Sequence, residues 1–526
     1  MKVNLIIGKV WTYVKTEDES AHRIIDNTLS VLAPHRFFVK SFKMKLWDGK
    51  KRFYDLIRQR FLTGFLSLVQ KNLKQRGYII EILDNNILPK PIEITEDVIL
   101  NGVDKERWEK VQLPVLKELL REGRGILRMA TSSGKTEVMA GIAKVMHDKK
   151  ILILVHRVEL LKQTVERLEN RLCEKIGQIT ANDIQIERVN VGMVMSVWSK
   201  RQELRKYLKE IDVVINDETH RASSNIWSKV LQVVDARWRF GMSGTPLKGD
   251  DVRDMTLIGL TGGIIEGHTV VDLVEAGYAV LPIVTLVNTT HILGKYDEND
   301  GNNQYTEDAL FNVIWVKEDE KRSLGKKTIA WIESKYMIDI PFIAIGKTIV
   351  IKIEDCEKLV LTRKGKPYNQ VYNSVYGDIK LWELLKNLLF NKKGVIIFTE
   401  RVNICLELTQ FLQRNGFNTG ATYGGLEDDK RIQVLKDLKD KKIDVLVCTT
   451  VIDEGIDVSN ISCIVFMTSN KSIVRILQRI GRGVRIEDGK DNVEIIDFII
   501  DAPYLKKHIL HRVKLYKTEQ FRLEIV

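Results

Sequence analysis

A short stretch of the chain combines glycine, lysine and threonine as phosphate-binding loops do. The stretch reads MATSSGKT (Met129–Thr136), follows an apolar run and precedes a helical pattern. In such a strand–loop–helix setting, the amides and dipole at the helix start attract an anion, and Gly134 permits its close approach. We expect Lys135 to reach the β- and γ-phosphates of ATP and Thr136 to ligate Mg²⁺. The strict motif has glycine where Met129 stands, so this is a variant loop. The other predicted loop contacts are Thr131, Ser132 and Ser133.

A second stretch ends an apolar run in two adjacent carboxylates. In VVINDETH (Val213–His220), Asp217 and Glu218 follow a mostly apolar run, about 80 residues beyond Lys135. The carboxyl ends of parallel strands form the ligand-binding edge of a sheet. We therefore expect Asp217 to hold Mg²⁺ through its hydration shell. Glu218 is expected to orient or deprotonate the water that attacks the γ-phosphate. ATP and Mg²⁺ are the predicted cofactors.

The elements that must position these residues lie in two regions where short apolar runs alternate with amphipathic helical patterns. The first region covers about 102–284 and includes a helical pattern over Val158–Leu172; the second covers about 379–500. Near-continuous apolar strands with crossover helices indicate parallel sheets covered on both faces, so we predict two doubly wound α/β domains. The predicted strands lie in GILRMA, KILILVH, VNVGMVMSV, DVVIN and RWRFGMS, and then in GVIIFTE, DVLVCTT, CIVFMTS and VEIIDFII.

The remaining segments follow other patterns. Residues 1–100 mix short alternating runs with a basic block and predict a small α+β domain. Between the α/β regions, Tyr296–Tyr305 reads as a turn-rich loop and Lys347–Pro367 alternates like a β-hairpin, which predicts a β-rich insertion. The predicted domains are 1–100, 101–286 (first α/β domain), 287–375 (insertion), 376–505 (second α/β domain) and 506–526 (a C-terminal helical tail).

Composition and charge restrict the class of protein. The 526 residues are 44% hydrophobic with a formal charge of +12, and twelve lysines and arginines stand against two aspartates between His35 and Arg76. Such a block is typical of a surface that faces a polyanion. None of the five cysteines forms a C-x-x-C pair, which suits a reducing compartment. No apolar run is long enough for a signal peptide or a membrane span. We expect a cytoplasmic protein, in the host cytoplasm if it is phage-encoded.

The motifs ATSSGKT, DETH, SGTP (Ser243–Pro246) and QRIGRGVR (Gln478–Arg485) occur in an order and spacing that resemble superfamily 2 helicases and translocases. VHRVELLKQT (Val155–Thr164) and TTVIDEGIDV (Thr449–Val458) resemble two further motifs of that superfamily. The resemblance implies two RecA-like motor domains with ATP between them. It also implies an adenine-reading glutamine (Gln112), arginine fingers (Arg482 and Arg485), nucleotide contacts (Gly455 and Asp457) and residues that couple nucleotide state to the bound strand (His220, Ser243, Thr245 and Gln478).

The N-terminal stretch resembles the UvsW-like family of phage recombination helicases, which has XPB-type relatives. The similarity rests on Phe37–Asp55, which contains WDGK, on Gly64–Tyr78, and on Ile264–Val284, which closes the first motor domain. It implies a DNA helicase that tracks 3′→5′ and unwinds or branch-migrates forks, junctions and R-loops, as a monomer or with other recombination or replication proteins. The predicted DNA contacts are Arg157, Thr164, Thr399, Arg401, Thr449 and Thr450 in the motor and Lys43, Lys45, Lys50, Lys51 and Arg52 in the basic block.

Three alternatives stay open at the level of sequence. A restriction-enzyme motor subunit would share the motor motifs but needs a nuclease partner, and a duplex translocase would remodel protein–DNA complexes without separating strands. A non-enzymatic DNA tether would release no phosphate. The aromatic residues of the basic block interleave with its charges, and we expect them to form that domain's core; they are Phe37, Phe38, Phe42, Trp47, Phe53 and Tyr54.

Overall fold

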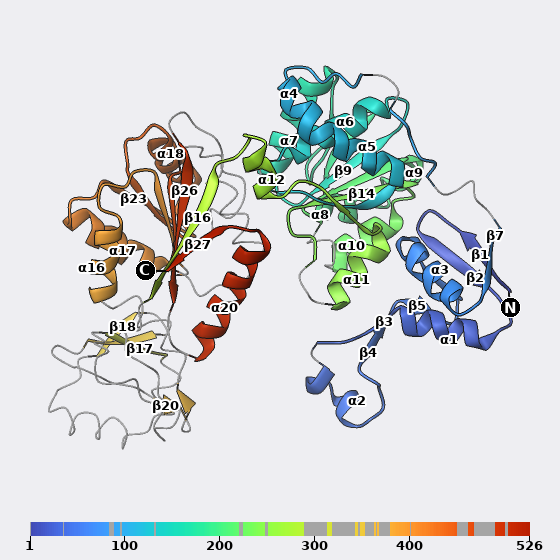
Figure 1. The fold of residues 1–526 in the computed structure, drawn as a ribbon, viewed down its shortest axis with the longest axis horizontal. Helices are drawn as coiled ribbons and strands as arrows, with labels where there is room; N and C mark the ends of the chain where they lie inside the picture. Colours follow the sequence, from blue (N-terminus) through green and yellow to red (C-terminus); the bar gives the residue numbers. More distant parts are fainter. Residues whose placement is uncertain are drawn as a thin grey trace. The chain divides into compact units, whose positions relative to one another are not determined.

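The computed structural model divides the chain into two compact units, Met1–Leu273 and Val274–Val526. It describes residues 2–34, 36–83, 89–94, 97–130, 133–219, 225–247, 251–288, 379–399, 401–449, 461–467, 490–499 and 503–525, together with short strands between 313 and 367. Figure 1 shows the elements in sequence colours.

The first unit begins with a small five-stranded sheet in the order β5-β6-β2-β1-β7. Burial alternates along β1, which places Val3, Leu5 and Ile7 on the side of the core. Asp18 caps α1 by accepting the Ser20 N–H at 2.8 Å. The bounds are β1 Lys2–Ile7, β2 Trp11–Lys15, α1 Glu19–Thr28, β5 Tyr54–Asp55, β6 Arg60–Leu62, η2 Thr63–Phe65, α3 Leu66–Gln75 and β7 Ile79–Ile82.

A basic arm extends from this small domain. Strand β3 (Ser30–Leu32) pairs with β4 (Lys50–Arg52), and between them lie the short helices η1 (Arg36–Phe38) and α2 (Lys40–Lys43). We call Ser30–Arg52 the arm and Arg36–Asp48 the arm tip. Figure 1 shows the tip at the far end of β3 and β4, away from the strands of the small sheet.

The first motor domain contains an eight-stranded sheet in the order β11-β10-β12-β9-β13-β14-β8-β15, in which every neighbouring pair of strands except β10–β11 is parallel. This arrangement confirms the predicted doubly wound sheet. The strands are β8 Arg124–Arg128, β9 Ile151–Val155, β10 Gly177–Ile179, β11 Ile184–Gln185, β12 Val189–Met193, β13 Val213–Asp217, β14 Trp238–Ser243 and β15 Ile264–Glu266. The helices are α4 Lys105–Arg107, η3 Trp108–Gln112, α5 Leu113–Glu122, α6 Lys135–Val145, α7 Val158–Leu172, α8 Val194–Ser199, α9 Arg205–Glu210, α10 Asn225–Val233, α11 Asp251–Leu260 and α12 Val270–Glu275.

Alternate residues of the central strands face two different layers. Helices α5, α6 and α7 pack together over one face, as Figure 1 shows. Ile126, Leu154 and Val214 belong instead to a core shared with α8, α10 and α11. The buried Arg239 guanidinium donates to the carbonyls of Leu260 (3.0 Å) and Val234 (3.1 Å), and so satisfies the carboxyl-terminal ends of α10 and α11.

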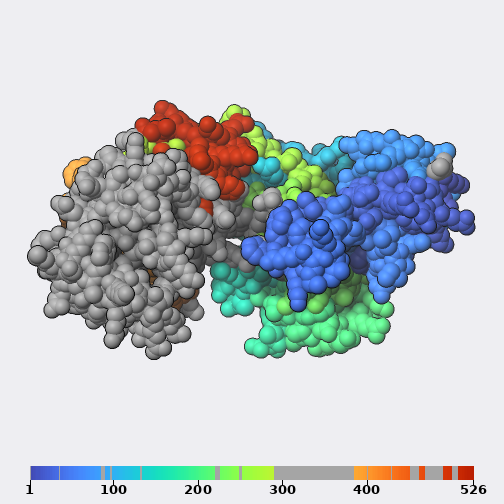
Figure 2. Space-filling model, turned by 90° about the horizontal axis from the view of Figure 1, so that it is seen from below, coloured from blue at the N-terminus to red at the C-terminus, as the bar shows by residue number. Residues whose placement is uncertain are grey.

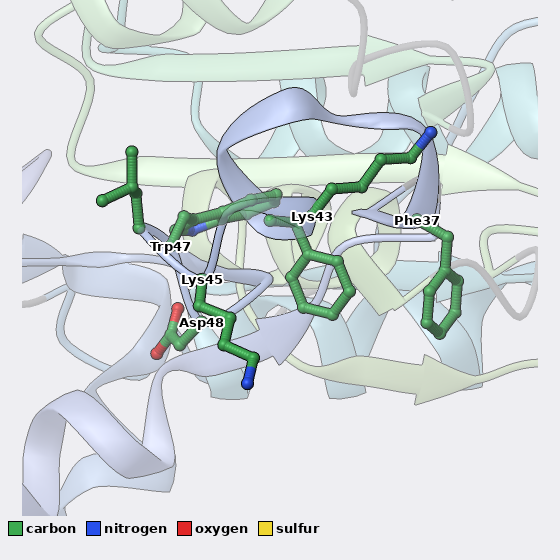
Figure 3. Close-up of a pocket in the computed structure, with 7 residues that line it drawn as sticks. Phe37, Lys43, Lys45, Trp47 and Asp48 are labelled. Carbon is green, nitrogen blue, oxygen red and sulfur yellow. The ribbon is translucent and has the colours of Figure 1, made fainter.

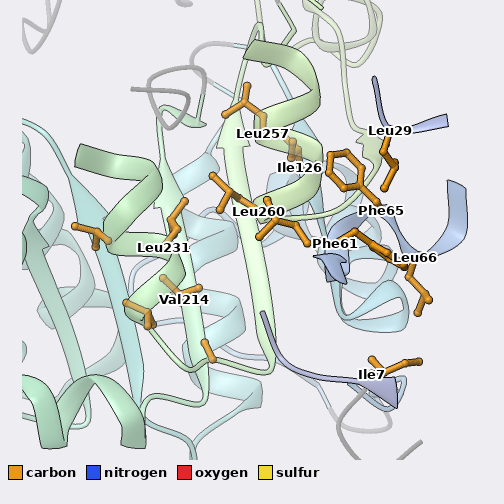
Figure 4. Close-up of a cluster of buried hydrophobic side chains, with 14 of the residues drawn as sticks. Ile7, Leu29, Phe61, Phe65, Leu66, Ile126, Val214, Leu231, Leu257 and Leu260 are labelled. Carbon is orange, nitrogen blue, oxygen red and sulfur yellow. The ribbon is translucent and has the colours of Figure 1, made fainter. Parts of the chain in front are cut away.

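The small domain and the first motor domain share one continuous core. Phe61 and Phe65 pack with Leu257 and Leu260 of α11 (Figure 4). A Cβ on Gly64 would lie 2.6 Å from the Gly259 carbonyl oxygen, and a Cβ on Gly259 would lie 2.5 Å from the Phe65 ring. The two glycines therefore permit a backbone approach that no other residue type allows. The small domain is packed onto the motor domain rather than tethered to it.

The second unit contains a seven-stranded parallel sheet in the order β23-β24-β22-β25-β26-β16-β27. Helices α16 and α17 share a core with one face of this sheet, through Leu385, Leu389, Leu408 and Leu412. The strands are β16 Leu281–Asn288, β22 Val395–Thr399, β23 Thr419–Thr422, β24 Val445–Cys448, β25 Cys463–Met467, β26 Asn492–Ile499 and β27 Arg522–Ile525; the helices are α16 Ile379–Leu388, α17 Val402–Arg414, α18 Asp428–Lys439 and α20 Pro503–Thr518.

A buried ion pair fixes α20 against this sheet. Asp497, fully buried on β26, accepts hydrogen bonds from Arg512 Nε (2.7 Å) and Nη2 (2.8 Å) and from the Tyr516 hydroxyl (2.9 Å). Bidentate pairing with an arginine is the arrangement that makes a buried carboxylate tolerable.

Two boundaries differ from those expected from the sequence. The first motor domain was expected to run to residue 286, yet β16 pairs with β26 and β27 of the second sheet. The apolar run of β16 cannot by itself indicate which of two sheets it joins, since both have open edges. The expected C-terminal helical tail is wrong in its last residues, because β27 forms the edge of that same sheet next to β16.

The insertion contributes strands in the ranges that the structure describes. Strands β17 (Val313–Lys317), β19 (Thr348–Lys352) and β18 (Phe342–Ile345) form a three-stranded antiparallel sheet, and β20 (Thr362–Arg363) pairs with β21 (Lys366–Pro367). The β-rich character is thus confirmed, although β19 pairs with strands that precede it. Tyr296–Tyr305 lies outside the described residues. Across the described parts of the chain, no helix has the length and apolarity needed to cross a membrane.

Candidate nucleotide-binding site

The predicted phosphate loop joins β8 to α6 in the first unit. Gly134 precedes the first residue of α6 with φ = 94°, a left-handed conformation that favours glycine. A Cβ at this position would lie 2.5 Å from Gln112 Nε2. Lys135 Nζ lies 3.4 Å from the Met129 carbonyl oxygen, a long contact that leaves most of its donor capacity for an anion. Ser133 donates its hydroxyl to the Ala130 carbonyl at 2.6 Å, which turns the loop.

Gln112 reaches the loop from the end of a π-helical turn, η3, which leads into α5. Its buried amide Nε2 donates to the Ser133 carbonyl at 2.8 Å. Its Oε1 is buried without a hydrogen-bond partner among the described residues. An unpaired buried acceptor costs about 1–3 kcal/mol and is free to accept a bond from an exocyclic amine. The geometry therefore fits an adenine reader that also braces the phosphate loop.

The two carboxylates lie at the end of β13, separated from β8 by β14 in the same sheet. Glu218 has φ = 50°, and its N–H donates to Asp217 Oδ1 at 3.0 Å. The turn is stabilised by the Thr219 hydroxyl, which donates to the Asn216 carbonyl at 3.0 Å. Gly241 leaves room for the Thr219 side chain. A left-handed non-glycine residue at a strand end is a strained arrangement that is concentrated at functional sites.

Burial first, and then the charge of the adjacent Glu218, raise the pKa of Asp217 to about 7, although the charge of Lys135 opposes both effects. Lys135 therefore lies close enough to Asp217 for their charges to interact. The pair of carboxylates is an anionic site with one cation beside it, and Mg²⁺ would remove the repulsion. Thr136 is the first-turn neighbour of Lys135 on α6. These residues fit a Mg²⁺–nucleotide site.

Strand β14 connects the two halves of this site. The buried Ser243 ends β14, and its carbonyl accepts the Met129 N–H at 3.1 Å. Its hydroxyl lies 3.3 Å from the Thr245 N–H. A movement of the phosphate loop would therefore reach SGTP directly, through the hydrogen bond between Met129 and Ser243. The predicted coupling role needs such a connection. His220 lies outside the described residues.

Several predicted site residues fall outside the described part of the chain. They are Thr131, Ser132, Thr450, Gly455, Asp457, Gln478, Arg482 and Arg485. The predictions for them therefore stay predictions.

Two predicted DNA contacts occupy matching places in the two units. Arg157 follows β9 and is the N-cap residue of α7, and Arg401 follows β22 and is the N-cap residue of α17. Both have extended backbone (φ −134° and −119°), and both are exposed. Each arginine thus stands at the carboxyl end of a central parallel strand, where phosphate groups can be reached.

The predicted threonine contacts are less accessible. Thr164, Thr399 and Thr449 are buried, and the Thr399 hydroxyl donates to the Cys448 carbonyl at 3.3 Å. In this conformation the Thr399 hydroxyl cannot contact DNA. The sequence pattern could not distinguish a hydroxyl that lines a surface from one that ties two strands together.

The N-terminal predictions divide in a similar way. Lys43, Lys45 and Lys51 are exposed and Lys50 is half-buried. Arg52 is already engaged, since its guanidinium pairs with Asp26 (3.1 Å) and Asp48 (2.5 Å). Tyr54 is buried in the core, as expected. The expectation that all six aromatic rings form this domain's core is wrong for Phe37 and Phe38, which are exposed on the arm tip because the tip is too small to enclose them. Phe42 and Trp47 are partly buried on the same tip, and Phe53 is partly buried against the core.

Comparison with known proteins agrees with this architecture. Residues 102–248 match the family described as "Type III restriction enzyme, res subunit", and residues 380–487 match "Helicase conserved C-terminal domain". The two matched segments carry the phosphate loop and the carboxylates in the first and the QRIGRGVR motif in the second. The chain is a superfamily 2 helicase, an ATP-hydrolysing class with two RecA-like domains.

Individual relatives extend the similarity over most of the chain. The DNA 3′-5′ translocase XPB2 of Sulfurisphaera tokodaii is 25% identical over 81% of this chain and 89% of its own length. The putative helicase 22 of a Sulfolobus islandicus filamentous virus is 22% identical over 76% of this chain and 64% of its own length.

Similarity over nearly the full length is found to the ATP-dependent DNA helicase uvsW of Enterobacteria phage T4, which is 23% identical over 97% of this chain and 95% of its own length. The crystal structure of T4 UvsW covers 100% of this chain and 99% of its own at a TM-score of 0.43 and 18% identity.

Proposed function

We propose that this superfamily 2 helicase is a DNA motor that moves 3′→5′ along one strand and unwinds or branch-migrates forked and junction DNA. The observation that carries the proposal is the meeting of Lys135 with Asp217 and Glu218 at one edge of the first sheet. The similarity to a protein named as a 3′-5′ translocase and to one named as a DNA helicase supports DNA as the track and supports the direction. Recombination, repair or replication restart is the process that such a substrate implies.

The residues of the site have distinct roles in ATP hydrolysis. Lys135 and the amides at the start of α6 bind the phosphates, and Gln112 accepts a bond from adenine through Oε1. Asp217, through water, and Thr136 would hold Mg²⁺, which neutralises phosphate charge when it is bound. Glu218 positions the attacking water and takes its proton.

Four residues beyond the described part of the chain complete the proposed reaction. Arg482 and Arg485 would neutralise the charge that develops on the transferred phosphoryl group, a contribution typically worth about 10³-fold or more in rate. Gly455 and Asp457 would contact the nucleotide, with Asp457 on the ribose.

The DNA grip rests on charge. The exposed Arg157 and Arg401 stand at equivalent strand ends of the two motor domains, and exposed lysines line the arm. Contacts to phosphate carry no sequence information, so the proposed motor is independent of sequence and weakens as salt rises. The formal charge of +12 agrees with such a substrate.

One alternative is favoured by a specific observation. The family that matches the first motor domain is named after a restriction-enzyme subunit, and an ATP-dependent restriction–modification enzyme bound to DNA overlays this chain with a TM-score of 0.49, over 34% of that enzyme's length. A duplex translocase that never separates strands uses the same ATP site. The two functions differ in product and not in chemistry.

Two displacement assays distinguish them. A labelled strand annealed at a fork reports unwinding, and a triplex-forming strand on intact duplex reports translocation alone. The proposal expects fork unwinding that needs a 3′ single-stranded tail and stops in Glu218→Gln. Displacement of the triplex with no unwinding of any fork would favour the duplex translocase.

A further inference from the structure

The arm tip presents apolar rings that no described part of the chain covers. Phe38 is 82% exposed and Phe37 is 58% exposed, and Leu46 is also exposed. Single exposed apolar side chains are ordinary, but several on one short projecting segment mark an interaction site. In Figure 2 the dark-blue N-terminal residues form a rounded knob on the face that is turned to the viewer.

The tip is organised from within, and contacts inside it hold the exposed Phe37 ring in place. The Phe42 ring packs edge-on against Phe37 (centroids 5.4 Å apart) and Trp47 (6.2 Å apart). Trp47 Nε1 donates to the Lys50 carbonyl at 2.9 Å. Gly49 has φ = 78°, and a Cβ there would lie 2.7 Å from the Phe42 ring. Phe42 and Trp47 therefore serve as a miniature core, and Phe37 and Phe38 remain outside it.

Positive charge surrounds these rings. The segment Arg36–Arg52 contains seven lysines and arginines and one acidic residue, Asp48. Arg52 donates two hydrogen bonds to Asp48, which lowers the pKa of that carboxyl and keeps it ionised and neutralised. Among the described residues, Lys40, Lys43 and Lys45 form no ion pair, in contrast to Arg52. The ligand that fits is a polyanion.

Phe37, Lys43 and Lys45 line an open hollow of about 540 Å³ beside Phe38, together with Phe42, Leu46, Trp47 and Asp48. Figure 3 shows Lys43 and Lys45 extended in different directions beside the aromatic side chains. Its volume lies within the range of about 300–1,000 Å³ that small-molecule sites span, so a nucleobase fits. The Arg36 guanidinium already lies over one face of the Phe37 ring, 4.4 Å from its centroid.

We propose that the arm tip binds unpaired nucleotides, with Phe38 and Phe37 stacking on bases and Lys43 and Lys45 contacting the flanking phosphates. Aromatic rings and adjacent cations are the combination that binds single-stranded nucleic acid without sequence preference. The inference rests on the proposed function, because a DNA motor supplies such nucleotides where strands separate. The small domain packs directly onto the first motor domain, so the tip is carried by that domain as it moves along DNA.

The test compares the full-length double variant Phe37→Ala/Phe38→Ala with wild type on three DNAs: blunt duplex, a fully paired four-way junction, and a fork with unpaired nucleotides. Stacking on one base contributes about 1–3 kcal/mol, so binding of the fork should weaken about 5- to 150-fold. Binding to blunt duplex should change less than about two-fold. Phe390→Ala, which removes an equally exposed ring (73%) from the second unit, is the matched control and should change neither. Phe38→Trp should retain fork binding.

A base analogue locates the contact. With 2-aminopurine at an unpaired position of the fork, wild type should change its fluorescence and the double variant should not. Lys43→Ala/Lys45→Ala should weaken binding to all three DNAs and reduce the salt dependence. Retained fork affinity and an unchanged fluorescence response in the double variant would overturn the inference. So would loss of binding to anionic phosphatidylserine vesicles, or of self-association, with fork binding intact. If wild type binds none of the DNAs, the proposed function itself fails.

Discussion

Replacing Asp217 with asparagine should stabilise the nucleotide-free protein while abolishing ATP turnover. The carboxylate sits at the end of β13 beside Glu218, and burial together with that neighbour raises the pKa of Asp217 to about 7. Ionising the Asp217 carboxyl therefore costs free energy in the folded protein, and this cost is absent in the unfolded chain. Asparagine has the same shape, and its Oδ1 can still accept the Glu218 N–H.

The size of the effect follows from the two pKa values. The ordinary pKa is 3.8 and the folded value is about 7, a difference of about three units at about 1.36 kcal/mol each. Because the pKa is raised on folding, the folded state holds more protons between these values, and wild-type stability falls as pH rises from about 4 to 7. Above pH 7 the cost is constant. Asparagine removes this cost of ionisation. The free energy of unfolding of the variant should therefore exceed that of wild type by at most about 4 kcal/mol at pH 8 and by little at pH 4.

Urea unfolding of the full-length protein in EDTA, followed at pH 4.5 and pH 8, measures the difference. Glu203→Gln, an exposed carboxylate of the same unit, is the matched neutralisation and should show almost no pH-dependent gain. Adding Mg²⁺–ATP should raise the melting temperature of wild type and not of Asp217→Asn. A variant less stable than wild type at pH 8, or a gain that does not depend on pH, would refute the reasoning.

The other predictions concern the motor and the packing inside each of the two units. Lys135→Ala should abolish ATP hydrolysis and spare most DNA binding; retained turnover would exclude the phosphate-loop assignment. Arg482→Ala should lower kcat with a modest loss of ATP affinity, and a pure binding defect measured by titration would contradict a finger role. Arg512→Ala leaves the buried Asp497 carboxylate uncompensated and should destabilise the second unit by about 3–5 kcal/mol in urea, whereas a loss below about 1 kcal/mol would show that the ion pair is dispensable. Gly64→Ala forces the backbone of α11 away and should lower the free energy of unfolding by about 1–3 kcal/mol, which should appear as faster proteolysis between the small domain and the first motor domain. Unchanged cleavage would mean that these two domains already separate readily in wild type.

Local patterns were sufficient to predict the central strands of both sheets, whereas the short strands β10, β11, β15 and β23 were not predicted. Helix α7 occupies the predicted range, and each apolar run of the first motor domain contains a strand. The central strands were predictable for a physical reason, because parallel strands that are buried on both faces must be apolar throughout. Gln112 was expected from the resemblance to superfamily 2 helicases, but its π-helical setting and its hydrogen bond to the Ser133 carbonyl were not expected.

Tertiary contacts determined which sheet a strand joins and which side chains are buried, and local sequence patterns did not indicate either. The strand β16 joins the second sheet because that sheet offers β26 as a neighbour, and β27 then closes the same edge. Phe37 and Phe61 look alike in the sequence, yet only Phe61 has a motor-domain helix to pack against. Arg239 lies in the predicted strand RWRFGMS, and the sequence did not indicate that its charged side chain is buried; helix ends supply the carbonyls that accept hydrogen bonds from its guanidinium. For β16 and Phe61 the partner lies far away in the chain.

The most direct test of the account is the rate of phosphate release measured side by side with single-stranded DNA, duplex, fork, four-way junction and RNA. The account predicts that DNA accelerates ATP hydrolysis, that forks and junctions do so more than blunt duplex, and that Lys135→Ala removes the activity with every nucleic acid. Hydrolysis that no DNA accelerates, or that responds to RNA alone, would contradict a DNA motor built on Lys135, Asp217 and Glu218.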